Sequence, residues 1–186
     1  KSLNQKHFEA NPFEESLAAR IESFELAYRM QIAAPEALDL SRETVAVHRM
    51  YGTEEPRCNA FARQALIARR LVERGVRFVQ IYSGGFDNKD CWDGHTNIDV
   101  NHRQFAGETD QPIAALLTDL KQRGLLESTL VVCCGEFGRL PLVQKGGTGR
   151  DHNQNGFSVW LAGAGLPRSS EWIQVYSTRS NPMAST

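Results

Sequence analysis

The chain has 186 residues, of which 23% are charged, and its formal net charge is -1 at pH 7. This length suits one domain of ordinary size or a large piece of a bigger one. A net charge near zero excludes the basic surface with which proteins bind nucleic acid or anionic membranes. No apolar run approaches the roughly 20 residues of a membrane span, and residues 1–30 lack the apolar core of a signal peptide. The sequence therefore predicts a small ligand and no nucleic-acid or membrane partner, and it leaves open whether a full-length form is exported.

Two helices are expected before residue 75. In residues 12–34 the apolar side chains recur at helical spacing, and residues 58–74 are rich in Ala, Leu and Arg and end before Gly75. The apolar face of the first helix is formed by Leu17, Ile21, Phe24 and Tyr28. Residues 35–56 mix a short helical pattern with turn residues, which is typical of a connector.

After Gly75 the sequence changes from helical spacing of apolar residues to short runs of β-forming residues. Residues 76–82 and 129–134 are rich in β-formers and predict strands, and residues 109–123 between them predict a helix. A helical crossover makes two strands parallel. Residues 135–155 lack helical periodicity, so the next strand, 157–161, is expected to be antiparallel. The predicted fold class is α/β, with a mostly parallel sheet and one antiparallel strand.

The four cysteines have no CxxC spacing, so we expect no disulfide framework. Cys133 and Cys134 lie in the apolar run TLVVCC and are interpreted as small buried strand residues.

Three polar loops are expected to meet at one edge of this sheet, because ligands gather outside the carboxyl ends of parallel strands. These loops contribute Asp93 and His95, then Glu136, and then Asp151 and His152. Carboxylates and imidazoles are the ligands of Zn²⁺ and similar divalent ions. The pattern therefore predicts a metal site formed by Asp93, His95, Glu136 and His152, with glycines that allow close backbone approach.

Other polar residues near these loops have weaker assignments. Arg139 and Arg150 can hold a phosphate or sulfate group, because a guanidinium offers a planar fork of donors. His102 is a candidate auxiliary residue of the site, whereas His7 and His48 are interpreted as surface residues. The alternative for every loop is structural: an Asp-x-His pair is common, and a histidine beside an aspartate often only makes a hydrogen bond.

Four motifs in order resemble domain-of-unknown-function family 1501, a bacterial family often labelled sulfatase-like within the alkaline phosphatase superfamily. They are LVERGVRFVQ at 71–80, TDQPIAALL at 109–117, GEFGR at 135–139 and GRDH at 149–152. The resemblance covers about residues 14–165. It implies an α/β/α sandwich with a divalent-metal site that hydrolyses or transfers phosphate or sulfate esters.

The resemblance also assigns roles to single residues. Asp93 and His95 look like a Trp-Asp-x-His element, Glu136 stands where metal-dependent relatives have an aspartate, and His152 looks like their late metal histidine. Those relatives follow the aspartate with a histidine, where this chain has Phe137.

A resemblance to this family implies that the chain is incomplete as an enzyme. The superfamily's nucleophile lies near the start of the full domain, and the sequence around Cys58 does not fit a sulfatase-type cysteine motif. We therefore interpret residues 1–165 as the C-terminal portion of one domain, helical over 12–74 and sheet-forming over 75–165, which lacks its N-terminal half. Residues 166–186 are atypical and are expected to be a disordered tail, from a truncated or frameshifted gene end.

The expected function is the C-terminal portion of a metal-dependent hydrolase of phosphate or sulfate esters, inactive by itself. Arg139 would be catalytic, Asp93, His95, Glu136 and His152 would bind a divalent ion (Zn, Ca, Mg or Mn), and Arg150, Asp151 and His102 would contact substrate. No nucleophile is assigned. A rival interpretation is a non-catalytic module that binds sulfated or phosphorylated glycans through Arg139 and Arg150. A third is a partial domain whose loops only cover the sheet.

Overall fold

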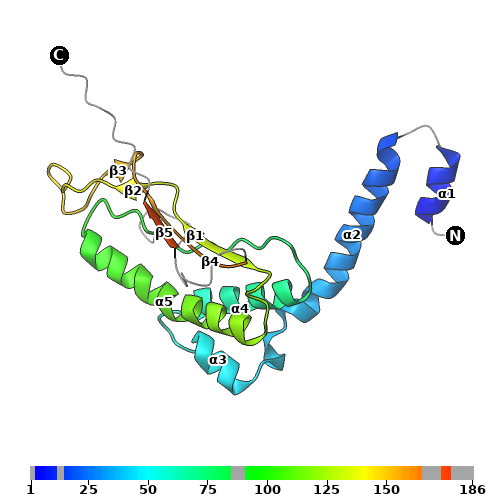
Figure 1. Ribbon diagram of the computed structural model, residues 1–186, viewed down its shortest axis with the longest axis horizontal. Coiled ribbons are helices and arrows are strands. Elements are labelled where there is room, and N and C mark those ends of the chain that lie inside the picture. The colour runs from blue at the N-terminus through cyan, green and yellow to red at the C-terminus, as the bar shows by residue number, and fades with distance from the viewer. Residues whose placement is uncertain (1–2, 12–14, 85–90, 165–172, 177–186) are drawn as a thin grey trace, which may run out of the picture. The chain divides into compact units, whose positions relative to one another are not determined.

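The protein is described by a computed structural model that covers residues 3–11, 15–84, 91–164 and 173–176 (Figure 1). It divides into two compact units, Lys1–Arg42 and Glu43–Thr186. The first unit contains α1 (Leu3–Ala10), α2 (Glu15–Leu38) and the short 3-10 helix η1 (Leu40–Arg42). The second unit contains α3 (Val45–Tyr51), α4 (Asn59–Glu73), α5 (Ile98–Gln122), β1 (Leu130–Cys134), β2 (Gly138–Arg139), β3 (His152–Asn153), β4 (Ser158–Gly163) and β5 (Ile173–Tyr176).

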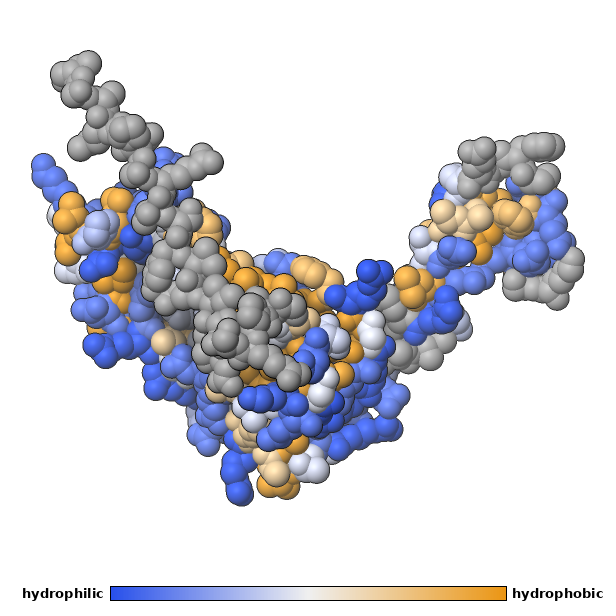
Figure 2. Space-filling model, in the orientation of Figure 1, coloured by the Kyte–Doolittle hydropathy of each residue, from blue (hydrophilic) through white to orange (hydrophobic). Residues whose placement is uncertain are grey.

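The first unit is helical, as its apolar spacing predicts. The Asn4 amide of α1 donates a hydrogen bond of 3.1 Å to the Glu25 carboxylate of α2. Helix α2 continues past the predicted end at residue 34 and includes Pro35. Leu17 on the predicted apolar face is buried, but Phe24 is 71% exposed. Hydrophobic side chains are accordingly visible on the surface of this unit in Figure 2.

The helices of the second unit pack around a shared core. Helix α4 ends where predicted, and Gly75 beyond it has a φ of 80°, a left-handed conformation that favours glycine. Helix α5 begins at Ile98, earlier than the predicted start at residue 109, and ends at Gln122. Both helices pack against each other, and α3 packs on α5. The apolar residues buried there include Tyr51, Ala62, Leu66, Phe105 and Leu120.

A network of charged side chains centred on a buried arginine lies between these helices. Arg69 of α4, whose side chain is 2% exposed, forms ion pairs of 2.7 Å with Glu43, 2.5 Å with Glu73 and 2.8 Å with Asp119. Arg123 forms ion pairs of 2.6 Å with Asp119 and 2.5 Å with Glu73. We call this set, completed by Arg70 paired with Glu43, the buried ion network.

The buried ion network is balanced in charge, because three guanidinium groups face three carboxylates. Burial alone would raise the pKa of Glu43, but hydrogen bonds from Arg69 and Arg70 lower it below the ordinary value. The Tyr51 hydroxyl donates to Asp119 over 3.1 Å, and burial, followed by the Asp119 charge, raises the pKa of this phenol. The groups of the network therefore pair with one another inside the fold, although Nε and Nη2 of Arg69 face Asp119 and Glu43 at ion-pair distance without hydrogen-bond geometry.

The strands form two small antiparallel sheets. One has the order β1-β4-β5, in which Val132 of β1 faces Leu161 of β4. The other pairs β2 with β3, so that Arg139 lies opposite His152. The antiparallel direction expected for the strand after residue 155 is therefore present in β4.

The predicted mostly parallel sheet, and with it the α/β/α sandwich, is wrong. In the described part of the chain every strand pair is antiparallel, and residues 76–82, the first predicted parallel strand, form neither helix nor strand. The β-rich composition of that segment measures its fit to a pleated surface, but a strand also needs a partner. Strand β1 takes its partner, β4, from later in the chain, and α5 packs on α3 and α4. The fold is mostly helical.

The stretch predicted to be a disordered tail contains a strand within its described part. Residues Ile173–Tyr176 form β5, which pairs with β4. The rest of 166–186 lies outside the described residues. All four cysteines are free, and Cys134 is exposed although a buried position was expected, whereas Cys133 is half-buried.

Candidate metal centre

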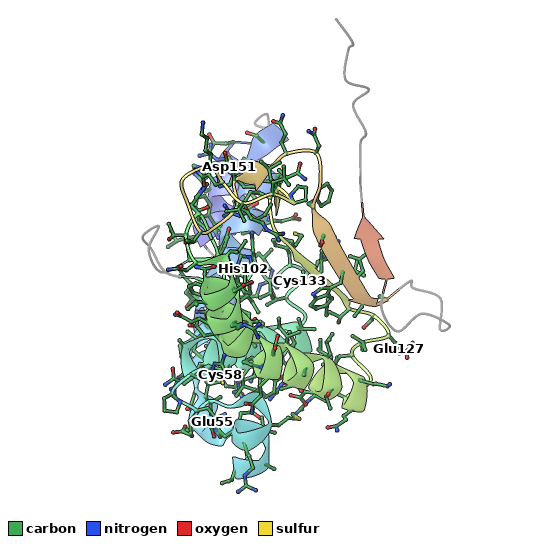
Figure 3. All side chains as sticks on the ribbon, turned by 90° about the vertical axis from the view of Figure 1, so that its left-hand side faces the viewer. Glu55, Cys58, His102, Glu127, Cys133 and Asp151 are labelled. Carbon is green, nitrogen blue, oxygen red and sulfur yellow. The ribbon has the colours of Figure 1, made fainter. Side chains whose placement is uncertain are left out.

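Two loops and a short hairpin bring three of the four predicted ligands together. Asp93 and His95 lie in the turn that precedes α5, and His152 lies on β3. Trp92 fixes this turn: its ring packs against Phe105 of α5 with centroids 5.5 Å apart, and its indole N–H donates to Ser83 over 3.0 Å. The loops lie beyond the end of α5 that carries His102, as the position of Asp151 in Figure 3 shows.

The glycine-rich segment 144–150 docks directly on the Asp93–His95 turn. The Arg150 amide donates to the Gly94 carbonyl over 3.1 Å. Gly149 is buried so tightly that a Cβ there would lie 2.2 Å from the Gly94 carbonyl oxygen. The Asn97 amide donates to the Thr148 hydroxyl over 2.8 Å. Glycine at position 149 is therefore required for the backbone approach that carries β3 and His152 toward Asp93.

Three potential ligand atoms converge within a small space. The Nε2 atom of His152 lies 3.0 Å from Oδ1 of Asp93 and 3.1 Å from Nε2 of His95, and the latter lies 3.2 Å from the same Asp93 oxygen. The three side chains are 31% (Asp93), 35% (His95) and 42% (His152) exposed, so solvent reaches the group. We call these three residues the Asp93 cluster.

Arg139 sets the electrostatics of the Asp93 cluster. Its guanidinium pairs with the Asp93 carboxylate and also donates to the Arg150 carbonyl over 2.9 Å. Hydrogen bonds from Arg139 and then from His152 lower the pKa of Asp93 below its ordinary value, outweighing the opposing effect of burial. Asp93 is therefore an ionised carboxylate at neutral pH, which is the form that binds a cation.

Outer contacts orient both imidazoles. The Nδ1 atom of His95 lies 3.0 Å from the Gln144 amide oxygen. The ring of His152 stacks against Phe137, with centroids 4.2 Å apart and an angle of 39° between the planes. Sequence patterns gave no signal for Gln144, because a single glutamine in a glycine-rich segment has no motif.

Comparison with known proteins gives a family without an assigned activity. A family model described as Protein of unknown function (DUF1501) matches residues 1–172. The chain belongs to this family. No curated protein and no solved structure matches the chain. Among the helices that the structure describes, none has the length and apolar character needed to cross a membrane.

Four other predicted site residues of this DUF1501 chain lie outside the Asp93 cluster. Glu136 is exposed between β1 and β2, and it is not part of the three-residue group that could hold an ion. His102 hydrogen-bonds the Ile98 carbonyl within α5 over 3.1 Å and packs edge-on against Trp92, so it supports the turn. Arg150 and Asp151 flank the cluster and have exposed side chains, and the Asp151 carboxylate accepts from the His152 amide over 2.8 Å.

The donor set of the DUF1501 chain suits some ions better than others. A tetrahedral zinc ion with ligands at about 2.0–2.1 Å places neighbouring ligand atoms about 3.3–3.4 Å apart. The separations within the Asp93 cluster, 3.0, 3.1 and 3.2 Å, are close to that edge length. Ca²⁺ and Mg²⁺ prefer shells of about six or more oxygens, whereas this group offers two nitrogens and one oxygen. The residues fit zinc or a similar transition-metal ion.

Proposed function

We propose that the DUF1501 chain binds one zinc-like divalent ion at Asp93, His95 and His152, as part of a hydrolase of phosphate or sulfate esters. The observation that carries the proposal is the convergence of three ligand atoms at 3.0–3.2 Å on a solvent-accessible face. Three protein ligands leave one tetrahedral position for water or substrate, as in catalytic zinc sites. The choice of ester follows the sulfatase-like resemblance of the sequence.

A bound ion of this kind acts as a Lewis acid on an ester oxygen and lowers the pKa of bound water. The protein supplies the charges around it. Arg139, whose guanidinium lies against Asp93, is placed to steady an anionic ester as charge develops. Arg150 has an exposed side chain in the adjoining segment and is the second candidate to contact a phosphate or sulfate.

Metal content and turnover together test this proposal. The purified chain, dialysed against zinc and then against buffer, is expected to retain one equivalent, and His152→Ala is expected to retain much less. Any hydrolysis of an aryl phosphate or an aryl sulfate should then depend on zinc. Less than one equivalent of metal in every preparation, with no change in His152→Ala, would end the enzyme proposal.

A second candidate function is supported by Phe137 and Arg139. Phe137, which stands where metal-dependent relatives have a histidine, stacks against His152, and Arg139 already pairs with Asp93. These contacts suit a module that binds a sulfated or phosphorylated glycan without metal. Binding of a sulfated glycan on an array in the presence of a chelator, lost in Arg139→Met, would support the module. Binding that requires zinc would contradict it.

A further inference from the structure

We infer that Gln144 is a positioning residue for the cation, because its side-chain oxygen holds His95 in the tautomer whose Nε2 faces the other two ligands. This inference rests on the proposed metal site and deepens it. The distance from the Gln144 Oε1 atom to the His95 Nδ1 atom is 3.0 Å. With the amide oxygen facing Nδ1, this contact requires the proton on Nδ1, because an amide oxygen only accepts hydrogen bonds.

The tautomer decides whether His95 can bind an ion at all. A neutral imidazole with its proton on Nδ1 has a lone pair on Nε2, the atom 3.2 Å from Asp93 and 3.1 Å from His152. The opposite tautomer would direct an N–H bond at that position. Histidines that bind metals commonly donate their second ring N–H to an oxygen acceptor, which fixes the ring and raises its basicity.

A carboxylate near the same nitrogen is the competing acceptor, but its geometry is worse. Oδ1 of Asp151 lies 4.0 Å from Nδ1 of His95, which is too long for a hydrogen bond. The same oxygen accepts from the His152 amide over 2.8 Å. The acceptor for His95 is therefore Gln144.

The backbone holds Gln144 in place. The backbone amide of Gln144 donates to the Gly149 carbonyl over 2.9 Å, and its backbone carbonyl accepts from the Gly147 amide over 3.0 Å. Gly146 between them has a φ of 77°, which favours glycine. The Thr148 hydroxyl, bonded to the Asn97 amide over 2.8 Å, ties the segment to the start of α5. The turn that fixes Gln144 is thus anchored to the element that follows His95.

The test measures the zinc dissociation constant by competition with a fluorescent chelator. Gln144→Met keeps the length of the side chain but removes the acceptor, so the dissociation constant should rise about ten- to a hundredfold. Gln144→Glu keeps an oxygen acceptor and should bind zinc as tightly as the wild type or more tightly. The matched control is Gln154→Met, at an exposed position in the turn after β3, which should leave zinc binding unchanged.

A second readout needs no metal. The ¹⁵N shifts of the His95 ring in the metal-free protein should report the proton on Nδ1 in the wild type and in Gln144→Glu, and a shift toward Nε2 in Gln144→Met. A merely structural role would not move this tautomer. Equal zinc affinity of Gln144→Met and wild type, or a wild-type His95 protonated on Nε2, would overturn the role of Gln144 while leaving the metal site intact. A wild-type chain that binds no zinc would overturn both proposals.

Discussion

The second unit contains two groups of ionisable side chains that differ in every physical respect. The buried ion network centres on Arg69, which is 2% exposed and pairs with three carboxylates. The Asp93 cluster is about one-third exposed and has two imidazoles beside one carboxylate. Arg69 at the centre of the network is enclosed, whereas solvent reaches every side chain of the cluster.

The difference in burial indicates which group stabilises the fold and which group is available to bind a ligand. Buried charges without partners cost several kcal/mol, so removing a member of the network should destabilise the fold. Exposed polar groups carry little of the folding free energy, so the Asp93 cluster can be altered with little effect on the fold. Ionisable side chains therefore have different roles in the two groups because their solvation differs.

The largest effect is expected from Arg69→Met, which leaves Glu43, Glu73 and Asp119 without their shared cation. Removing one partner of a buried ion pair costs about 3–5 kcal/mol. Urea unfolding followed by circular dichroism measures this loss. The control is Arg63→Met at an exposed position of the same helix, which should change stability by less than about 0.5 kcal/mol. A loss below about 1 kcal/mol in Arg69→Met would show that the network does not stabilise the fold.

His152→Ala is expected to weaken metal binding while leaving the stability of the fold nearly unchanged. It removes one of three ligands, so the zinc dissociation constant should rise by more than about a hundredfold, beyond the effect of losing an outer contact. Its unfolding free energy without metal should change by less than about 1 kcal/mol, because the side chain is 42% exposed. Titration calorimetry and urea unfolding give the two values. A variant with a lower unfolding free energy but an unchanged zinc dissociation constant would contradict this division of roles.

The pH dependence of stability should come from the buried ion network. The pKa of Glu43 is lowered in the folded protein below the ordinary 4.5, so the unfolded chain takes up the proton first as pH falls. The Glu43 contribution is complete above about pH 4.5 and is lost as pH falls through the lower folded pKa. Unfolding free energies between pH 6 and pH 3 should therefore fall less steeply in Glu43→Gln than in the wild type. An equal slope would contradict this, and Glu54→Gln, at an exposed position, is the control.

The smallest effect is expected from Glu136→Gln. Glu136 is exposed and lies outside the Asp93 cluster, so zinc affinity should change less than about threefold, which is under 1 kcal/mol. The same competition assay measures it. A tenfold loss would mean that Glu136 is a fourth ligand and that its loop moves on binding.

Local patterns in the sequence predicted α2, α4, the second half of α5 and the strands β1 and β4 correctly. The apolar spacing of α2 and the Gly75 stop of α4 are visible in the sequence, as is the apolar run of β1. Pairing was less predictable, because the strand signal at residues 76–82 specifies no neighbour. The prediction of a mostly parallel sheet was wrong for that reason.

The two charged groups differ in how well sequence predicts them. Residue types singled out Asp93, His95 and His152, and the backbone approach at Gly149 explains how they meet. Nothing singled out Gln144. Arg69 does have a sequence signal, because it continues the helical spacing of Ala62 and Leu66 on the buried face of α4.

The central claim is that the Asp93 cluster holds a cation, and a crystal grown with zinc tests it most directly. Anomalous scattering at the zinc edge should give one peak about 2.0–2.2 Å from an Asp93 oxygen and from the Nε2 atoms of His95 and His152. A map with no peak there, and with the guanidinium of Arg139 still bridging Asp93 in zinc-saturated crystals, would contradict the account.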